Sequence, residues 1–388
     1  MFGHAHFLLF QEVFGMTNDK AKDLVGRLLD SAGITLNGDK PYDILVKNEN
    51  LYKRILHDGI LGLGEAYMDD WWTCVRLDQL ADRVARTNIR KEIEKSWKLR
   101  RAVLKSRISN LQKPSRSFQV GEKHYDVGND LYRVMLDRRM LYTCAYWKNS
   151  NTLDEAQEAK LDLICRKIGL EPGMTVLEFG CGFGAFAKYA AEKYGVQVTG
   201  MTVSKEQAKL GREMCKGLPV EILLEDYRNI SGKYDRVISI GIMEHVGYKN
   251  YRTYMQRTNE TLKDDGIAFI HTIGGNHSST TANRWTTKYI FPNSMIPSMA
   301  QISKAMEGLF VMEDWHNFGE DYDKTLMAWH DKFEKAWPDL KTHYDDRFYR
   351  MWRFYLLTSA GSFRARSLQL WQIVMTKPGK KQPNCRFS

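Results

Sequence analysis

The chain has 388 residues, of which 43% are apolar and 12% aromatic, and its formal net charge is +10. This composition excludes a disordered chain, and the length favours about two domains of unequal size. The six cysteines show neither a C-x-x-C pair nor a zinc-ligand spacing, so we expect no disulfide framework, no metal site and a reducing cytoplasm. The sequence has no signal-peptide pattern and no run of roughly 18 apolar residues, so neither export nor a membrane-spanning helix is expected.

The first part of the chain is predicted to form a small separate domain. Residues 1–16 are an N-terminal extension, and in residues 17–89 Gly-bearing turns separate short apolar runs. This pattern is typical of a mixture of helices and short strands. We expect Trp71 and Trp72 in the core of this domain or at an interface.

Residues 90–121 are predicted to form a basic helical linker, in which Arg90 to Arg116 carry ten Lys or Arg against two Glu. One interpretation is a solvated helix that joins two domains. The other is a membrane-facing segment, because each basic residue near an anionic lipid surface contributes about 1 kcal/mol. The net charge favours an anionic partner in general, either nucleic acid or lipid, and does not distinguish the two.

Regular α/β alternation follows within residues 122–388. A capping box, Thr152 to Glu155, begins a helix that ends at Gly169. The segments that follow predict a doubly wound sheet: strands at 174–179, 196–201, 220–224, 234–242, 267–273, 309–318 and 368–377, and helices at 185–195, 204–217, 249–262, 322–341 and 346–364. The last two helices exceed what a plain sheet needs, so we expect them to be an insertion that covers the mouth of an active site.

The stretch VLEFGCGFG places Glu178 near the end of a strand and three glycines at the turn into a helix. Glycine lets the backbone turn sharply and approach a ligand, and a helix N-terminus favours negative charge. The dinucleotide pattern G-x-G-x-x-G is not matched, and no acidic residue ends the next strand to hold a ribose. An ordinary strand-to-helix turn remains the alternative.

The pattern E-x-G-x-G-x-G resembles the S-adenosylmethionine motif of Rossmann-like methyltransferases. This resemblance implies that Glu178 holds the cofactor's ammonium group, that Thr202 and Gln207 bind the ribose, and that Glu225 and Asp226 approach the adenine. The cofactor-binding turn itself would comprise Gly180, Cys181, Gly182 and Gly184. Ser204 is predicted to be a helix N-cap instead of a ligand.

Four further stretches, EKHYDVGNDLY, LYTCAYW, GIMEHVGYKNY and EDWHNFGEDYDKTLMAWH, complete a resemblance to the cyclopropane fatty acyl phospholipid synthases over residues 25–375. The family has a class I methyltransferase fold. It adds a methylene from S-adenosylmethionine across the cis double bond of an acyl chain in a membrane phospholipid. The resemblance implies that a bound bicarbonate is the base, held by Cys144, Glu244, His271, the backbone of Ile273, and Tyr322. It also implies that Tyr142 and Thr143 contact S-adenosylmethionine.

The chemistry of this family passes through a carbocation-like species, which aromatic faces stabilise. Such faces could come from Tyr142, Tyr146, Trp147, Tyr322 and Trp329, although several of these residues could equally be core. Cys144 could in principle be a nucleophile, a metal ligand or core, but the resemblance favours a wall of the anion pocket. Ser359 stands where relatives often have a cysteine, which argues against an obligatory thiol there. His124 and His245 could act as acids or bases, or be hydrogen-bonded structural residues.

We therefore expect a peripheral membrane enzyme of the cytoplasm, a homodimer, with a basic face that docks on anionic lipid. A related lipid C-methyltransferase with a methyl-branched or methylene product is the nearest alternative. A nucleic-acid methyltransferase is disfavoured, because no Asn/Asp-Pro-Pro-Tyr motif follows residues 234–242. A catalytically inactive S-adenosylmethionine-binding module is disfavoured by the set Glu244, His271 and Tyr322.

Overall fold

The computed structural model describes residues 17–87 and 128–387. The predicted N-terminal extension, the basic linker and His124 lie outside these residues, as do the predicted domain boundaries at 89 and 121. Within them, no helix combines the length and the apolar character that crossing a bilayer requires.

A seven-stranded mixed sheet forms the larger body of the described chain, with the strand order β5-β4-β3-β6-β7-β9-β8. Its strands are β3 (Thr175–Phe179), β4 (Gln197–Thr202), β5 (Val220–Leu224), β6 (Tyr234–Ile240), β7 (Leu262–Gly275), β8 (Val311–Asn317) and β9 (Leu368–Thr376). The first five strands in this order run parallel, and β9 is antiparallel to both β7 and β8. The predicted α/β class with a Rossmann-like sheet is confirmed.

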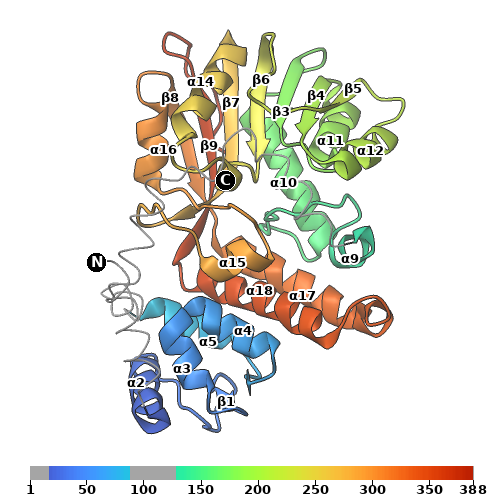
Figure 1. The fold of residues 1–388 in the computed structure, drawn as a ribbon. Helices are drawn as coiled ribbons and strands as arrows, with labels where there is room; N and C mark the ends of the chain where they lie inside the picture. Colours follow the sequence, from blue (N-terminus) through green and yellow to red (C-terminus); the bar gives the residue numbers. More distant parts are fainter. Residues whose placement is uncertain (1–16, 88–127, 388) are drawn as a thin grey trace, which may run out of the picture.

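Alternate residues of each strand face opposite helical layers, because side chains of a strand point to opposite sides in turn. Val176 packs in one layer with α10 (Leu153–Lys167) and α11 (Ala185–Tyr194). Leu177 packs in the other with α14 (Tyr251–Thr261) and α16 (Met299–Met306). Figure 1 shows these helix pairs on different sides of the sheet. Both faces are covered, which explains why the strands read as continuous apolar runs.

The helix boundaries follow local signals that the sequence contains. Thr152 and Glu155 form the predicted capping box at the start of α10, and Ser204 caps α12 (Lys205–Met214) by accepting a hydrogen bond from the Gln207 N–H. The Gly195 residue that ends α11 has a left-handed backbone, with φ 64°. The short helices α9 (Asn129–Met135) and α13 (Met243–Val246) lack a side-chain cap and were not expected. Neither were α15 (Arg284–Tyr289), which Asn283 caps, and α16, which begins with a capping box.

The predicted helical insertion between the last two strands is present as α17 (Glu320–Leu340) and α18 (Asp346–Arg364). Residues 17–87 pack beneath it (Figure 1) and comprise α2 (Asn18–Asp30), α3 (Leu51–Asp58), α4 (Ile60–Met68), α5 (Leu77–Arg86), β1 (Leu45–Val46) and β2 (Trp72–Thr73). One hydrophobic core joins both groups: the Trp72 ring lies 5.0 Å from Tyr67 and 6.4 Å from Phe354 of α18. Trp72 is therefore both a core residue and a contact to α18.

Buried ion pairs complete the contact between α5 and α18. Arg364 lies 2.7 Å from Asp78, a side chain that is only 1% exposed, and 2.8 Å from Asp323 of α17. The two helices approach so closely at Gly361 that a Cβ there would lie 2.3 Å from the Asp78 carbonyl oxygen and 2.7 Å from the Ala81 Cβ. A glycine is required at this crossing.

Gly361→Ala should therefore lower the free energy of unfolding by about 1–3 kcal/mol, because a methyl group in a filled contact forces the helices apart. Urea unfolding measures this. Gly26→Ala is the matched control, since Gly26 also lies within a helix but the nearest atom to its added Cβ is 3.9 Å away. The control should raise stability by up to about 1 kcal/mol. Equal stability of the two variants would contradict the close contact between α5 and α18.

Candidate active site

The glycine turn after β3 lies at the carboxyl edge of the parallel strands, beside the point where the strand order reverses from β4 to β6. Open α/β sheets bind ligands at this position. Gly180, Gly182 and Gly184 all have positive φ angles, of 71°, 55° and 80°. A Cβ on Gly180 would lie 2.0 Å from Ile242 Cδ1, whereas one on Gly182 would meet no atom within 4 Å. The backbone at Gly182 is thus open to a ligand.

Glu178, the acidic residue before this turn, is 2% exposed. Burial raises the pKa of its carboxyl to about 8. Its Oε2 has no hydrogen-bond partner among the described residues. A buried carboxylate without a full set of partners is costly unless a ligand completes it, and a cationic ligand does so best. Glu178 therefore fits the ammonium group of S-adenosylmethionine.

Polar side chains at the ends of β4 and β5 continue the same wall. The Thr202 hydroxyl donates to Gln207 Oε1 over 2.7 Å, and both side chains are buried. Asp226 accepts hydrogen bonds from the Arg228 backbone and guanidinium, the latter at 2.8 Å. Thr202 and Gln207 offer a hydroxyl and an amide, which suit the hydroxyls of a ribose, whereas Asp226 was predicted to approach the adenine.

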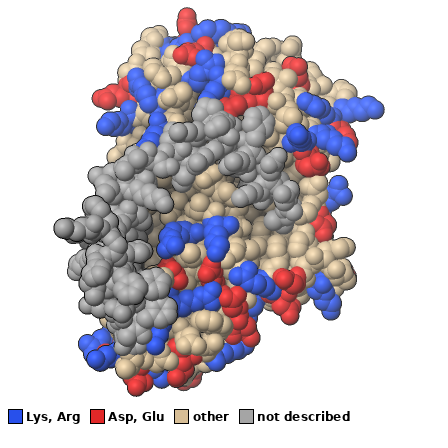
Figure 2. Space-filling view, in the orientation of Figure 1, with Lys and Arg blue, Asp and Glu red and all other residues tan. Residues whose placement is uncertain are grey.

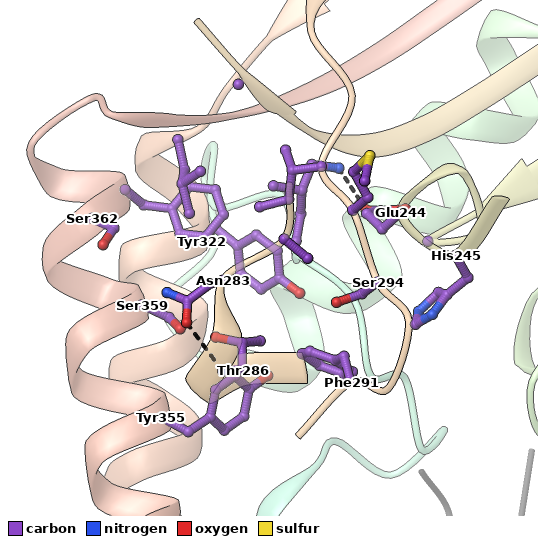
Figure 3. Close-up of a pocket in the computed structure, with 18 of the residues that line it drawn as sticks. Glu244, His245, Asn283, Thr286, Phe291, Ser294, Tyr322, Tyr355, Ser359 and Ser362 are labelled. Atoms are coloured by element: carbon purple, nitrogen blue, oxygen red, sulfur yellow. Dashed lines mark hydrogen bonds between the residues drawn. The ribbon is translucent and has the colours of Figure 1, made fainter. Parts of the chain in front are cut away.

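A second polar cluster lies where β6 and β7 end. Glu244 of α13 accepts the Ile273 backbone N–H at Oε1 over 2.6 Å, while its Oε2 has no partner in the described part of the chain. Burial raises the pKa of Glu244 to about 7. The Ile273 amide was expected to donate a hydrogen bond to an anion. Glu244 competes with the anion for this hydrogen bond, because it already accepts from the same amide. Figure 3 shows this hydrogen bond at the edge of the pocket.

His271 lies on β7, two residues before the Ile273 amide that Glu244 binds, and is 1% exposed. Burial, with a smaller contribution from Lys160, holds the pKa of its imidazole well below the ordinary value. The Gln372 amide nitrogen lies 3.4 Å from Nδ1, and a donor there leaves the imidazole hydrogen on Nε2. Nε2 has no partner among the described residues, so it is available to donate to an anion.

The loop from Leu141 to Ala145 is held by hydrogen bonds to two helices. The Tyr142 hydroxyl donates to Tyr355 of α18 over 3.0 Å, and the Thr143 hydroxyl accepts from Lys160 of α10 over 2.8 Å. Cys144 is fully buried, and burial raises the pKa of its thiol well above the ordinary value. A thiol held neutral is a poor nucleophile. Among the described residues no metal-binding cluster of His, Cys, Asp or Glu surrounds it.

One cavity of about 2450 Å³ connects both clusters. Its lining includes every predicted site residue except Gly184, namely Tyr142, Thr143, Cys144, Glu178, Gly180, Cys181, Gly182, Thr202, Gln207, Glu225, Asp226, Glu244, His271, Ile273 and Tyr322. Gly184 instead caps α11, where its φ of 80° suits glycine. In Figure 3, Tyr322 lies between Glu244 and His245 on one side and Ser359 and Ser362 of α18 on the other.

Three of the aromatic residues considered for a carbocation do not line the cavity: Tyr146, Trp147 and Trp329. Tyr146 packs on Phe318 at 5.3 Å between ring centroids, and the Trp147 indole donates to Thr325. Trp329 is fully buried behind Tyr142. These side chains support the lining, and Tyr142 and Tyr322 remain as faces of the cavity.

Several aromatic lining residues were not predicted from the sequence, among them Phe291 and Tyr355. Tyr355 contacts Tyr142 across 213 positions of sequence, and its ring centroid lies 5.6 Å from that of Phe291. No local pattern marks such residues, because α18 reads as an ordinary amphipathic helix. Their spacing would indicate only a buried face.

The sheet order and the glycine turn define a class I S-adenosylmethionine-dependent methyltransferase. A coclaurine N-methyltransferase shares this fold, with a TM-score of 0.66 and 21% identity over 82% of this chain and 99% of that one. The family model for mycolic acid cyclopropane synthetase matches residues 112–373. The chain belongs to this family, and it is an S-adenosylmethionine-dependent methyltransferase.

Two relatives illustrate the similarity. Cyclopropane-fatty-acyl-phospholipid synthase of Escherichia coli K12 is 48% identical over 366 residues, which cover 94% of this chain and 96% of the relative. The cyclopropane synthase MmaA2 of Mycobacterium tuberculosis has a TM-score of 0.63 and 29% identity, over 67% of this chain and 98% of that one. A mycolic acid cyclopropane synthase was solved with SAH and CTAB bound; it is 30% identical over 67% of this chain and 98% of that one, with a TM-score of 0.64.

Gly182→Ala should weaken S-adenosylmethionine binding at least tenfold in calorimetry, because the methyl group would project into the cavity where the backbone is open. Gly173→Ala is the matched control: Gly173 also has a positive φ, of 84°, and free space around its Cβ, but it does not line the cavity. Both variants carry a similar backbone strain, of about 1 kcal/mol. Unchanged affinity in Gly182→Ala would remove this turn from the cofactor site.

Proposed function

We propose that the protein transfers a methylene group from S-adenosylmethionine to the cis double bond of an unsaturated acyl chain in a membrane phospholipid, forming a cyclopropane ring. One observation carries the proposal. Two buried polar clusters with unused hydrogen-bonding atoms, one at Glu178 and one at Glu244 and His271, line the same large cavity as the loop Tyr142–Cys144. The similarity to the E. coli synthase over almost the whole of both chains supports the same substrate.

S-adenosylmethionine, when bound, supplies the electrophilic methyl group. Glu178 would hold its ammonium group, Thr202 and Gln207 its ribose, and Glu225 and Asp226 its adenine, while Tyr142 and Thr143 would contact it from the loop. The order of these side chains along one wall orients the cofactor toward the second cluster. An isolated alkene is a weak nucleophile, so such orientation and the exclusion of water supply much of the acceleration.

A bound bicarbonate would supply the proton acceptor in the second cluster. The residues there fit a small anion that carries one hydroxyl: Glu244 Oε2 is free to accept from that hydroxyl, and His271 Nε2 is free to donate to an oxygen. Tyr322 would donate from α17, Cys144 would form the wall, and Ile273 would share its amide with Glu244. These residues would hold the bicarbonate in one position. A proton next to a carbocation is very acidic, so a weak base is sufficient when it is positioned in this way.

The remaining cavity wall suits an acyl chain. Apolar side chains from residues 17–87 line it, including Leu24, Val25, Ile55, Leu63 and Val84. Tyr142 and Tyr322 lie closer to the polar clusters and would face the developing positive charge, each with an attraction of about 0.5–2 kcal/mol. The apolar wall thus leads toward the groups that carry the chemistry.

We further propose that the protein acts as a homodimer at the cytoplasmic face of an anionic membrane. The formal charge of +10 supports attraction to such a surface. On the face drawn in Figure 2, Lys and Arg are interspersed with Asp and Glu, so this face by itself is not a uniform basic patch. Charge reversal between Arg90 and Arg116 that left vesicle binding unchanged would contradict the docking role of the basic segment.

The product distinguishes the proposed reaction from that of a related C-methyltransferase. Phospholipid vesicles with unsaturated chains are incubated with S-adenosylmethionine that carries three deuterons on its methyl group. Each modified acyl chain should gain one carbon with two of these deuterons and lose its double bond. Mass spectrometry with and without ozonolysis detects both changes. A methyl-branched alkene, formed when the cation loses a proton from the chain, would retain all three deuterons and a cleavable double bond, and a methylene product would lose one deuteron but keep a cleavable double bond. Either result would overturn ring formation.

Glu244→Gln should lower turnover at least about 100-fold, the usual scale for loss of acid–base function, and leave S-adenosylmethionine affinity within threefold. The amide can still accept from Ile273, but it presents N–H donors where an acceptor is needed. Glu313→Gln is the control, because Glu313 is also buried and accepts from the Thr376 hydroxyl, but it does not line the cavity. Loss of cofactor binding in Glu244→Gln would move Glu244 to the methyl-donor site.

A further inference from the structure

Lys160 is a buried ammonium group to which the reaction as described assigns no role. It lies on α10, its side chain is fully buried, and its Nζ donates to the Thr143 hydroxyl over 2.8 Å. It forms no ion pair within the part of the chain that the structure describes. Burying a charge without a carboxylate partner opposes folding, so packing alone does not account for a lysine at this position.

Lys167, two turns further along α10, provides the contrast. It is equally buried, but its Nζ lies 2.8 Å from Asp314 and 3.1 Å from His316 Nδ1. Its charge is therefore balanced within the fold. Asp137 and Glu178 interact with the charge of Lys160 only at longer range. Burial lowers the pKa of the Lys160 ammonium to about 8.

The surroundings of Lys160 join the two ligand sites. Thr143, its hydrogen-bond partner, belongs to the proposed cofactor side, whereas Cys144, the next residue, forms the wall of the proposed base pocket. Gln157, one turn earlier on α10, donates to the Thr143 carbonyl over 2.9 Å and is also fully buried. Lys160 also acts electrostatically on His271, more strongly than Lys167 does. The ammonium thus lies behind the wall that separates the two sites.

We infer that Lys160 is a positioning residue for the anion of the active site: its ammonium holds the Thr143 hydroxyl in place and supplies the buried positive charge that draws an anion to the pocket beside Cys144. The inference rests on the proposed function, since it concerns the bicarbonate of that site. Glu244 repels an anion, and neutral His271 does not attract one by charge. Lys160 provides the opposite charge, because the weaker contribution of Lys167 is balanced by Asp314. The same ammonium would repel a cationic ligand on the cofactor side, and there the negative charge of Glu178 offsets it.

The test uses the full-length protein with bicarbonate as the probe, in buffer freed of dissolved carbon dioxide. Lys160→Met keeps the length of the side chain and removes its charge. The protein is saturated with S-adenosylhomocysteine, and its melting temperature is measured as bicarbonate is added. The bicarbonate midpoint is the concentration that gives half of the maximal rise in melting temperature. Lys160→Met should raise this midpoint at least tenfold. The same shift should appear in the bicarbonate dependence of activity. Affinity for S-adenosylmethionine should change less than threefold, and the melting temperature without ligands should stay equal or rise.

Lys167→Met is the matched control. It removes an equally buried charge that Asp314 balances, so it should lower the melting temperature and shift the bicarbonate midpoint less than threefold. An unchanged midpoint in Lys160→Met, or an equal shift in both variants, would overturn the role of Lys160. A wild-type protein that responds to bicarbonate in neither assay would instead overturn bicarbonate as the base, and Lys160 as its positioning residue with it.

A second variant keeps the inference testable if Lys160→Met does not fold. Thr143→Val removes the hydroxyl to which the ammonium donates, and Thr143→Ser retains that hydroxyl. The bicarbonate midpoint should rise severalfold in the valine variant relative to the serine variant. Equal midpoints in these two would contradict the inference.

Discussion

The burial of three ionisable groups at one cavity, Glu178 and Glu244 in its lining and Lys160 behind Thr143, is the constraint on which the rest of the site depends. Each of these groups loses its hydration on folding, and none has a complete set of partners in the described chain. A large hydrophobic core has to offset this cost. The sheet supplies that core on both of its faces, and the layers of α10 with α11 and of α14 with α16 keep water from the charged groups. The hydrophobic core thus offsets the cost of burying these ionisable groups.

The parallel strands convert this constraint into a defined geometry. Because β3, β4, β5 and β6 end at one edge, the side chains that follow them meet there although they are far apart in sequence. The loop Tyr142–Cys144 then divides the edge in two. It is held from α10 by Gln157 and Lys160 and from α18 by Tyr355, so its position does not depend on a ligand. Preorganisation of this kind lets polar groups act without rearranging when charge develops.

Much of this arrangement could be predicted from the sequence, because it rests on local signals. The capping box at Thr152, the glycine turn after Glu178 and the helical spacing in α17 and α18 each specify their element within a few residues. The likeness of five separate motifs to one family indicated which residues share the cavity. These signals are independent of how the elements pack.

Long-range packing could not be predicted in the same way. The Tyr142–Tyr355 hydrogen bond joins residues 213 positions apart, and the core shared by Trp72 and Phe354 joins opposite ends of the chain. Lysine in an amphipathic helix is normally assigned to the solvent side, so the burial of Lys160 could not be predicted from its helical position. The Ile273 amide was expected to donate to an anion, and its bond to Glu244 emerged only from the bend of the chain after β6.

The apolar wall contributed by residues 17–87 has a consequence for how members of this family diverge. The match to the family model begins at residue 112, yet side chains as early as Leu24 line the same cavity as Glu244 and Tyr322. The proposed reacting groups and much of the apolar lining are therefore encoded in different parts of the gene. Mutations in the first part can remodel the room available to a substrate while the reacting groups keep their places, so substrate range and chemistry are free to evolve at different rates.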